Sequence, residues 1–318
     1  MDGFADHGVP AEQAGHRLAP RIWRRADIDK LVASLLDGAA DAGGRRTSAL
    51  DNPELGVGGG VAPGVDVGVN VLRPGEVTTP HRHTSSVVNL VVRGEGTSHI
   101  GGREVRWGPG DVFTTPCWLP HSHAATGSEP AVRLSFSDAP LLRRQGILLA
   151  EEGDPEVAPS SSPAGWDPEV GVRVPESDGR LLGYQHLLKP VWSPIAPQHW
   201  SSASLHEALD PMDNDDPAYH GRRVFMLHDP ATGRAQGTVA GFVMFCGVIV
   251  PGEVHPPHRH TSVAINYYTA GSGWSIADGE RYEWEAGDVQ LTPAWAAHGH
   301  ANQGGGTVWG YTLQDTAL

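Results

Sequence analysis

The chain has 318 residues, 39% of them hydrophobic, and its 23 basic and 37 acidic side chains give it a formal net charge of −14. This negative charge argues against a nucleic acid or an anionic membrane as a partner. No apolar run is close to the length of about 20 residues that a membrane-spanning helix needs. Cys117 and Cys246 are too few for a disulfide framework, and the first residues show no secretory pattern, so we expect a cytoplasmic protein.

An N-terminal arm and a helix are predicted for residues 1–50. The stretch 25–38 (RADIDKLVASLLDG) has a helical apolar period and ends at a glycine. Its apolar face consists of Ile28, Leu31, Val32 and Leu35.

The strongest feature is an internal repeat. Residues 74–123 align with residues 251–300 without a gap, and 24 of the 50 positions are identical. The identities are mostly Gly, Pro, His and Trp, whereas the aliphatic positions differ, which indicates that turns and a site are retained while core packing varies. The repeat predicts one domain at 51–140 and a second at 226–318.

Between these domains, residues 141–225 are expected to form a linker and a helical excursion. Residues 151–180 are rich in Pro, Ser, Gly and acidic side chains, which is typical of a linker or a surface excursion. A short helix is predicted at 201–209 (SSASLHEAL).

Each repeat contains short runs of β-forming residues that are separated by glycine turns. These runs are residues 87–92, 101–107 and 109–116 in the first repeat and 264–270, 278–284 and 286–293 in the second. Short antiparallel strands at this spacing are typical of a small barrel or jelly roll, so we predict an all-β fold with a few short helices.

The sequence PHRHTS occurs twice, at residues 80–85 and 257–262. In a strand, His81 and His83 point to the same side and Arg82 points to the other. His121, from a later strand or loop, can face them across a barrel. Three neutral imidazoles leave open positions on an octahedral metal, as in mononuclear non-haem iron oxygenases.

The same pattern recurs in the second repeat, where His258, His260 and His298 form the matching set. An isolated His-x-His pair is often only a surface feature or a packed pair. The third histidine at identical spacing in both repeats favours a metal site in at least one of them. Whether one or both repeats bind metal stays open at this point.

The pattern PG-x5-HxH, followed by PGD-x4-P-x4-H, resembles the cupin superfamily. A typical cupin site adds a glutamate four or five residues after the second histidine, but those positions here are Val87 and Val88, and Ala264 and Ile265. An all-histidine set, with TPCWLPHSH and TPAWAAHGH around the third ligand, resembles the bicupin family of gentisate, salicylate and 1-hydroxy-2-naphthoate dioxygenases. PRIWRRADI (20–28), DNPELG (51–56) and HDPATG (228–233) extend this resemblance beyond the motifs.

The resemblance implies two double-stranded β-helix barrels and an extradiol-type, ring-cleaving dioxygenase that uses Fe(II), one or two ions per chain, or another divalent metal. Its partners would be a small aromatic substrate and O2, in a homodimer or homotetramer. Because neutral ligands leave the metal its full charge, an acidic protein can still bind an acidic substrate. Residues expected to act on the substrate are His123, Asn89 and Trp118 in the first repeat and His300, Asn266 and Trp295 in the second.

Several of these roles have simpler alternatives. His123 and His300 lie two residues beyond the third ligand and would contact either that ligand or the substrate, or else be solvated loop residues. Trp118 and Trp295 would offer a ring for stacking or only pack at the barrel mouth.

Asn89 should face the barrel interior, because it keeps the strand parity of His83. The gentisate-type pattern commonly has an arginine here, which holds the substrate anion, whereas both repeats have asparagine, with Asn266 in the second. Arg82 and Arg259 point outward and cannot replace it. Either another side chain supplies the cation, or the substrate is a modified aromatic such as a phenol or an amino- or nitro-substituted ring.

Two other functions remain compatible with the sequence. One is a metal-dependent isomerase or lyase that acts on a small polar molecule without oxygen. The other is a non-catalytic protein in which the metal holds a ligand or only the fold.

Overall fold

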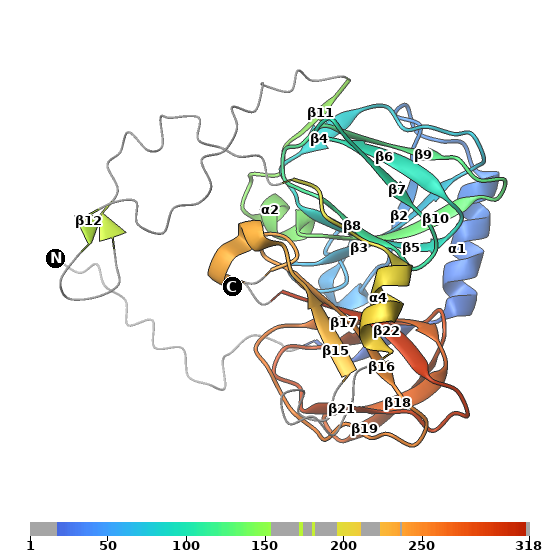
Figure 1. Ribbon diagram of the computed structural model, residues 1–318, viewed down its shortest axis with the longest axis vertical. Helices are drawn as coiled ribbons and strands as arrows, with labels where there is room; N and C mark the ends of the chain where they lie inside the picture. Colours follow the sequence, from blue (N-terminus) through green and yellow to red (C-terminus); the bar gives the residue numbers. More distant parts are fainter. Residues whose placement is uncertain are drawn as a thin grey trace.

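The computed structural model describes residues 18–153, 196–210, 223–235 and 237–315, together with the backbone of residues 172–173 and 180–181. Most of the predicted linker at 151–180 lies outside these residues. The two barrels lie one above the other in Figure 1, the first coloured blue to green and the second orange to red. The predicted all-β fold with two jelly-roll barrels is confirmed.

Each barrel is built from two antiparallel sheets that face each other. In the first barrel, one sheet has the order β14 (His199–Trp200), β8 (Val112–Thr115), β5 (Val87–Arg93), β10 (Ala131–Ser137), β3 (Asp66–Leu72) and β2 (Arg46–Ala49). The other has the order β11 (Ala150–Glu152), β4 (His81–His83), β9 (His121–Ala125), β6 (Gly96–Ile100) and β7 (Arg103–Trp107).

The second barrel repeats this plan. Its larger sheet has the order β1 (Arg21–Trp23), β20 (Val289–Thr292), β17 (Ala264–Ala270), β22 (Val308–Gln314), β16 (Val243–Ile249) and β15 (Arg223–Leu227). The smaller sheet contains β19 (Glu280–Glu285), β18 (Ser272–Ala277) and β21 (His298–Ala301). A separate hairpin joins β12 (Val172–Arg173) to β13 (Arg180–Leu181).

Within the described residues, the helices are few and short. They are α1 (Arg25–Asp37), α2 (Ala139–Arg144) and α4 (Ser202–Leu209), with 3-10 turns at Pro53–Leu55 and Pro230–Ala235. The predicted helices at 25–38 and 201–209 are therefore confirmed as α1 and α4. The apolar face of α1 packs on the main core, with Ile28 and Val32 buried and Leu31 and Leu35 partly buried.

The two barrels exchange edge strands. The N-terminal strand β1 pairs with β20 of the second barrel, with Trp23 opposite Val289. In the other direction, β14 pairs with β8 of the first barrel, with Trp200 opposite Val112. This exchange covers one edge of each large sheet. Buried residues of both barrels belong to one continuous hydrophobic core.

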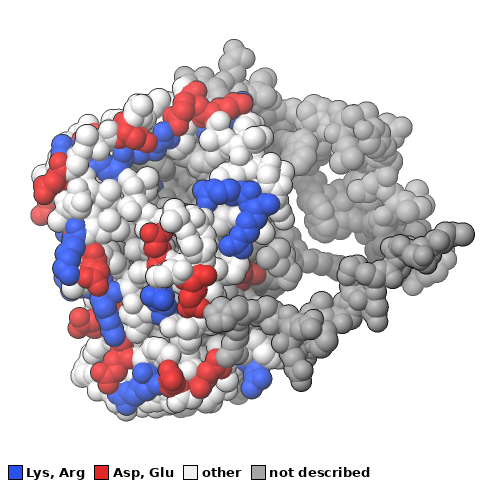
Figure 2. Space-filling model, turned by 180° about the vertical axis from the view of Figure 1, so that it is seen from behind, with Lys and Arg blue, Asp and Glu red and all other residues white. Residues whose placement is uncertain are grey.

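The outer surface carries charges of both signs. Figure 2 shows acidic and basic side chains interspersed over one face of the molecule, without a large patch of a single sign. No helix within the described ranges is both long and apolar enough to cross a membrane. Cys117 is exposed and Cys246 is buried, and both are free thiols.

A partly buried carboxylate recurs just after the last strand of each barrel. Asp138 accepts a hydrogen bond from the backbone N–H of Ser86 at 2.9 Å, and Asp315 accepts one from Val263 at 2.7 Å. Burial raises the pKa of Asp138 to about 6 and also raises the pKa of Asp315. The ionised form of Asp138 therefore costs folding free energy at neutral pH.

Replacing Asp138 with asparagine is expected to raise the melting temperature at pH 8 and to raise it less at pH 5. The folded carboxyl binds its proton up to about pH 6 and the unfolded one only up to about pH 4. The contribution of this group to stability therefore falls as the pH rises between these values, and it stays at its lowest above pH 6. Asparagine avoids this cost and still accepts the Ser86 bond.

Thermal melts followed by circular dichroism at both pH values test this expectation, with the exposed Asp210→Asn as a control. A gain in melting temperature that is equal at pH 5 and pH 8 would contradict it.

Candidate metal centres

Strands β4 and β9 bring three histidines together inside the first barrel. His81 lies directly opposite His121 in the antiparallel register, and His83 points to the same side as His81. Ring centroids are 4.2 Å apart for His81 and His121, 4.8 Å for His83 and His121, and 5.8 Å for His81 and His83. The potential ligand atoms all lie within 4.8 Å of one another, so one cation between them can reach all three.

Backbone carbonyls fix the tautomer of these rings. Nδ1 of His81, His83 and His121 lies 3.0, 2.9 and 2.8 Å from the carbonyl oxygen of Thr79, Ser85 and Leu119, respectively. Because a carbonyl oxygen only accepts, each Nδ1 carries the proton, and each Nε2 has a lone pair for a metal.

Burial also keeps the rings neutral. It lowers the pKa of His81 and of His83, and it lowers the pKa of His121 well below the ordinary range. All three imidazoles are therefore uncharged at pH 7, which is the form that binds a metal. Three neutral nitrogen donors fit Fe(II), as well as other divalent first-row metals.

The second barrel contains a matching triad. Centroids are 4.2 Å apart for His258 and His298, 4.8 Å for His260 and His298, and 5.6 Å for His258 and His260, and the ligand atoms again lie within 4.8 Å. Nδ1 of His260 and Nδ1 of His298 lie 2.9 and 2.8 Å from the carbonyl oxygens of Ser262 and Ala296. Gln314 Nε2 lies 3.3 Å from His260 Nε2, so this amide has to move when a metal binds.

The first triad opens into a cavity of about 100 Å³ that also contains arginine side chains. Arg45 pairs with Asp41 and Glu152, and Arg46 pairs with Glu76. Arg133 differs from both.

Arg133, on β10, is 5% exposed and donates to Asn89 Oδ1 at 2.8 Å. No carboxylate in the described part of the chain pairs with it. Its guanidinium lies 5.6 Å from the ring centre of Trp107. Burial lowers the pKa of Arg133 to about 10, so it remains a cation at pH 7.

Asn89 lies in this cavity and is buried, as its strand parity predicted. Its Nδ2 donates to Thr115 Oγ1 at 3.1 Å, and its Oδ1 holds Arg133. Asparagine here therefore positions the cation. Sequence reasoning missed Arg133, because β10 lies outside the aligned repeat and pairs with β5 over a long sequence distance.

His123 also lines the first cavity and is buried. Ser98 Oγ lies 2.7 Å from His123 Nδ1 and accepts the indole N–H of Trp107 at 2.8 Å. The hydroxyl proton of Ser98 is then available to Nδ1, which places the ring proton of neutral His123 on Nε2. Burial, aided by Arg133, lowers the pKa of His123 well below its ordinary range.

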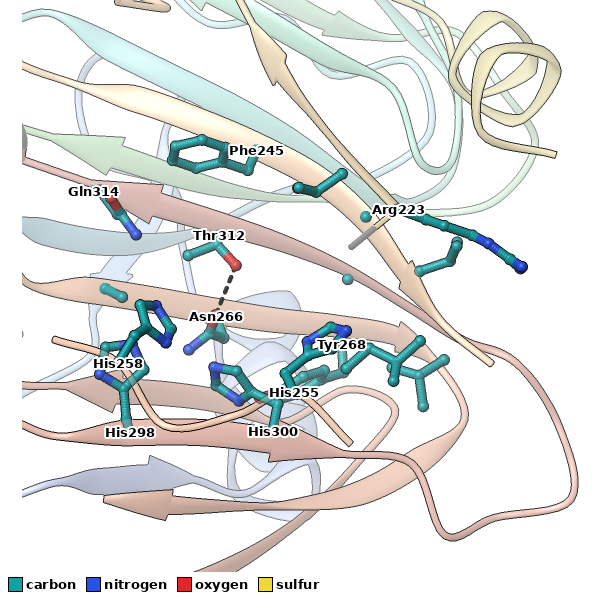
Figure 3. Close-up of a pocket in the computed structure, with 17 residues that line it drawn as sticks. Arg223, Phe245, His255, His258, Asn266, Tyr268, His298, His300, Thr312 and Gln314 are labelled. Carbon is teal, nitrogen blue, oxygen red and sulfur yellow. Dashed lines mark hydrogen bonds between the residues drawn. The ribbon is translucent and has the colours of Figure 1, made fainter. Parts of the chain in front are cut away.

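Two histidines of the second triad, His258 and His298, line a larger cavity of about 260 Å³ (Figure 3). Asn266 and His300 also line it. His300 Nδ1 lies 2.8 Å from Ser275 Oγ, as in the first barrel. Asn266 Oδ1 accepts the hydroxyl of Thr312 at 2.7 Å. Arg223 lies at the opposite end of this cavity from His258 in Figure 3.

Trp118 and Trp295 do not line either cavity. Each has a positive φ of 63°, and its backbone N–H donates at 2.8 Å to the carbonyl of the second histidine, His83 or His260. Arg82 lies 4.7 Å from the centre of the Trp118 ring, on the outer side of the strand. The two tryptophans thus hold the ligand-bearing strand, and the described cavities give no support for the predicted stacking role.

In sequence, the chain is similar to cupin proteins and to ring-cleaving dioxygenases. The cupin-domain family matches residues 68–137 and 247–309. The 1-hydroxy-2-naphthoate 1,2-dioxygenase of Nocardioides sp. (strain KP7) is 25% identical over 282 residues, which cover 86% of this chain and 68% of that protein. The 5-aminosalicylate 1,2-dioxygenase of Comamonas sp. is 39% identical over 145 residues, or 46% of this chain and 37% of that protein.

A solved structure shares the fold. The salicylate 1,2-dioxygenase from Pseudaminobacter salicylatoxidans superposes with a TM-score of 0.75 at 19% sequence identity, covering 97% of this chain and 88% of that one. At this identity, the likeness supports the double-barrel architecture alone.

Proposed function

Because the chain belongs to the bicupin family that includes the gentisate, salicylate and 1-hydroxy-2-naphthoate dioxygenases, we propose that its first barrel is a non-haem Fe(II) dioxygenase site. Its substrate would be a hydroxylated aromatic acid of the salicylate type, and its reaction would open the ring. Cleavage between the carboxyl-bearing and hydroxyl-bearing carbons, as in gentisate dioxygenases, replaces the extradiol expectation.

The observation that carries this proposal is the buried guanidinium of Arg133 next to three neutral imidazoles. A buried charge is costly unless an opposite charge compensates it, and the described residues offer no carboxylate partner. A divalent metal on the triad adds further positive charge. The site is therefore prepared for an anion, which a substrate carboxylate and an ionised phenol supply.

The chain's own residues divide the work of binding. Arg133, held by Asn89, would pair with the substrate carboxylate and fix the orientation of the ring. His123, with its proton on Nε2, would donate a hydrogen bond to a substrate oxygen in the cavity. When bound to the triad, a ferrous ion would supply open coordination positions and redox chemistry with dioxygen.

The size of the first cavity bears on how the substrate lies. A cavity of about 150 Å³ encloses benzene, and this one measures about 100 Å³. It therefore fits the carboxylate and phenol head of a salicylate, while the far side of the ring extends toward solvent. Ring substituents such as the amino group of 5-aminosalicylate would then be tolerated, which agrees with the likeness to the Comamonas enzyme.

Oxygen dependence tests the proposal. The Fe(II)-loaded protein should consume O2 with salicylate, gentisate or 5-aminosalicylate in air and give a ring-opened acid, and it should be inactive without air. An oxygen electrode and mass spectrometry of the product measure both outcomes. Turnover of a small polar substrate without air would instead support an isomerase or lyase, and one metal per triad without any turnover would support a binding protein.

Self-association is also proposed. The edge strand β15 exposes the apolar side chains of Val224 and Met226, which are 37% and 46% exposed. Uncovered apolar edges favour pairing with another copy, in agreement with a homodimer or homotetramer. Light scattering coupled to size-exclusion chromatography measures the state directly.

A further inference from the structure

We propose that the second triad is the centre of a separate site, which binds an uncharged phenolic ligand rather than an aromatic acid. This inference does not need the ring cleavage proposed above. It needs only that the triad of the second barrel holds a divalent metal.

In the second barrel, no cationic side chain stands at the position equivalent to Arg133. The shift that aligns residues 74–123 with 251–300 places Gly310 at the position of Arg133. The strand registers agree with this shift, because Arg133 lies opposite Asn70 and Val91, and Gly310 lies opposite the corresponding Gly247 and Tyr268.

In the second barrel, an aromatic ring packs on the tryptophan whose counterpart faces the guanidinium in the first barrel. Tyr268 stacks on Trp284 with centroids 3.7 Å apart and an interplanar angle of 6°. The equivalent Trp107 instead faces Arg133. A Cβ atom on Gly310 would lie 3.5 Å from the Tyr268 ring, so a long cationic side chain there would have to displace it. The packing of the second barrel therefore replaces the charged side chain of Arg133 with the neutral ring of Tyr268.

Close to the triad, the second cavity offers the neutral amide of Asn266. Asn266 is 5% exposed, and its Nδ2 is buried without a hydrogen-bond partner. In the first barrel the equivalent Nδ2 of Asn89 is satisfied by Thr115. Figure 3 shows Asn266 between Thr312 and the histidines that line the cavity. A buried unpaired donor calls for an acceptor, which a phenol oxygen or an amide carbonyl of a ligand provides.

The size of the cavity agrees with a whole aromatic ligand. The cavity has a volume of about 260 Å³, which exceeds the volume of about 150 Å³ that encloses benzene. Its apolar lining includes Phe245, Val248 and Val308. Arg223 is the cation of this cavity, and it lies at the end away from His258. A carboxylate bound at the triad would therefore lack the compensating guanidinium that the first site offers.

Salicylate and salicylamide form a matched pair of probes, since they have nearly the same shape but only salicylate carries a full negative charge at its head group. Two double variants isolate the sites. The variant His81→Ala with His83→Ala keeps only the second triad intact. The variant His258→Ala with His260→Ala keeps only the first triad intact. Each is loaded with Co²⁺, and the visible absorption of the bound cobalt is titrated with each probe.

We expect the variant with only the second triad to bind salicylamide at least about tenfold more tightly than salicylate, and the variant with only the first triad to show the reverse order. In the variant that keeps only the second triad, Asn266→Asp removes the donor and adds a negative charge. It should therefore weaken salicylamide binding about tenfold. Circular dichroism shows whether each double variant folds. If one does not, the single variant His83→Gln replaces the double variant of the first triad, and His260→Gln replaces that of the second.

The inference is overturned if the second triad binds salicylate more tightly, if neither probe changes its cobalt spectrum, or if it does not retain cobalt. These outcomes are independent of the proposed dioxygenase activity, which the oxygen consumption of the iron-loaded wild-type protein measures separately.

Discussion

His81→Ala is expected to lower the oxidation of salicylate-type acids by at least about 100-fold. His81 supplies one of three nitrogens to the first triad, and its ring is held by the carbonyl of Thr79. Losing even an outer partner of a metal ligand typically costs about 10- to 100-fold in metal affinity or activity, so losing the ligand itself should cost more. Oxygen consumption at saturating Fe(II) measures the rate, and elemental analysis measures the metal content.

Two comparisons show whether the effect is specific. His99→Ala alters an exposed histidine of the same barrel, which pairs only with Glu104 at the surface, and should leave the rate within about twofold. His258→Ala should remove metal from the second triad and reduce acid oxidation less than tenfold, because the first cavity is intact. If His258→Ala abolished the reaction and His81→Ala did not, the second barrel would be the oxidising site.

The histidines of the candidate metal centres could be predicted from the sequence because their placement depends on local rules. His81 and His83 share a face through the strand period, and the same rule placed Asn89 in the barrel interior. The third histidine of the first triad, His121, was identified from its recurrence at identical spacing in both repeats. The runs of β-forming residues between glycine turns likewise predicted the positions of strands β5, β7 and β8.

What could not be predicted depends on pairing between distant segments. Arg133 reaches Asn89 only because β10 lies next to β5 in the sheet, and no local pattern specifies that register. The exchange of β1 and β14 between the barrels is of the same kind. Of the two roles left open for Trp118, its contact with Arg82 and its place outside both cavities agree with packing rather than with stacking on a ligand.

In the two sites that we propose, one repeat supports two ligand chemistries. The residues that hold the triads are retained, whereas Arg133 has become Gly310 and Val91 has become Tyr268. Because the two changes are neighbours in the sheet, the loss of the charge and the filling of its space occur together. In this proposal, the charge of the head group that each site prefers is set by strands that carry no histidine of the triads.

Arg133→Gln is expected to weaken salicylate binding to the first site by about 30-fold or more. Removing one partner of a buried, hydrogen-bonded charge pair costs about 2–5 kcal/mol, and about 1.4 kcal/mol corresponds to a tenfold change in the dissociation constant. Salicylamide, which has no carboxylate to lose, should change by less than about threefold. Titration of the Co²⁺-loaded protein that lacks the second triad measures both constants.

The fold should tolerate this change. The guanidinium of Arg133 is buried without a carboxylate among the described residues, so its removal leaves no orphaned partner charge, and the melting temperature should not fall by more than a few degrees. Arg82→Gln is the matched control, because Arg82 adjoins the ligands but pairs with Glu151 on the outer side of the strand. Equal losses for salicylate and salicylamide in Arg133→Gln, or a loss of the same size in Arg82→Gln, would show that Arg133 supports the structure of the site and does not select the anion.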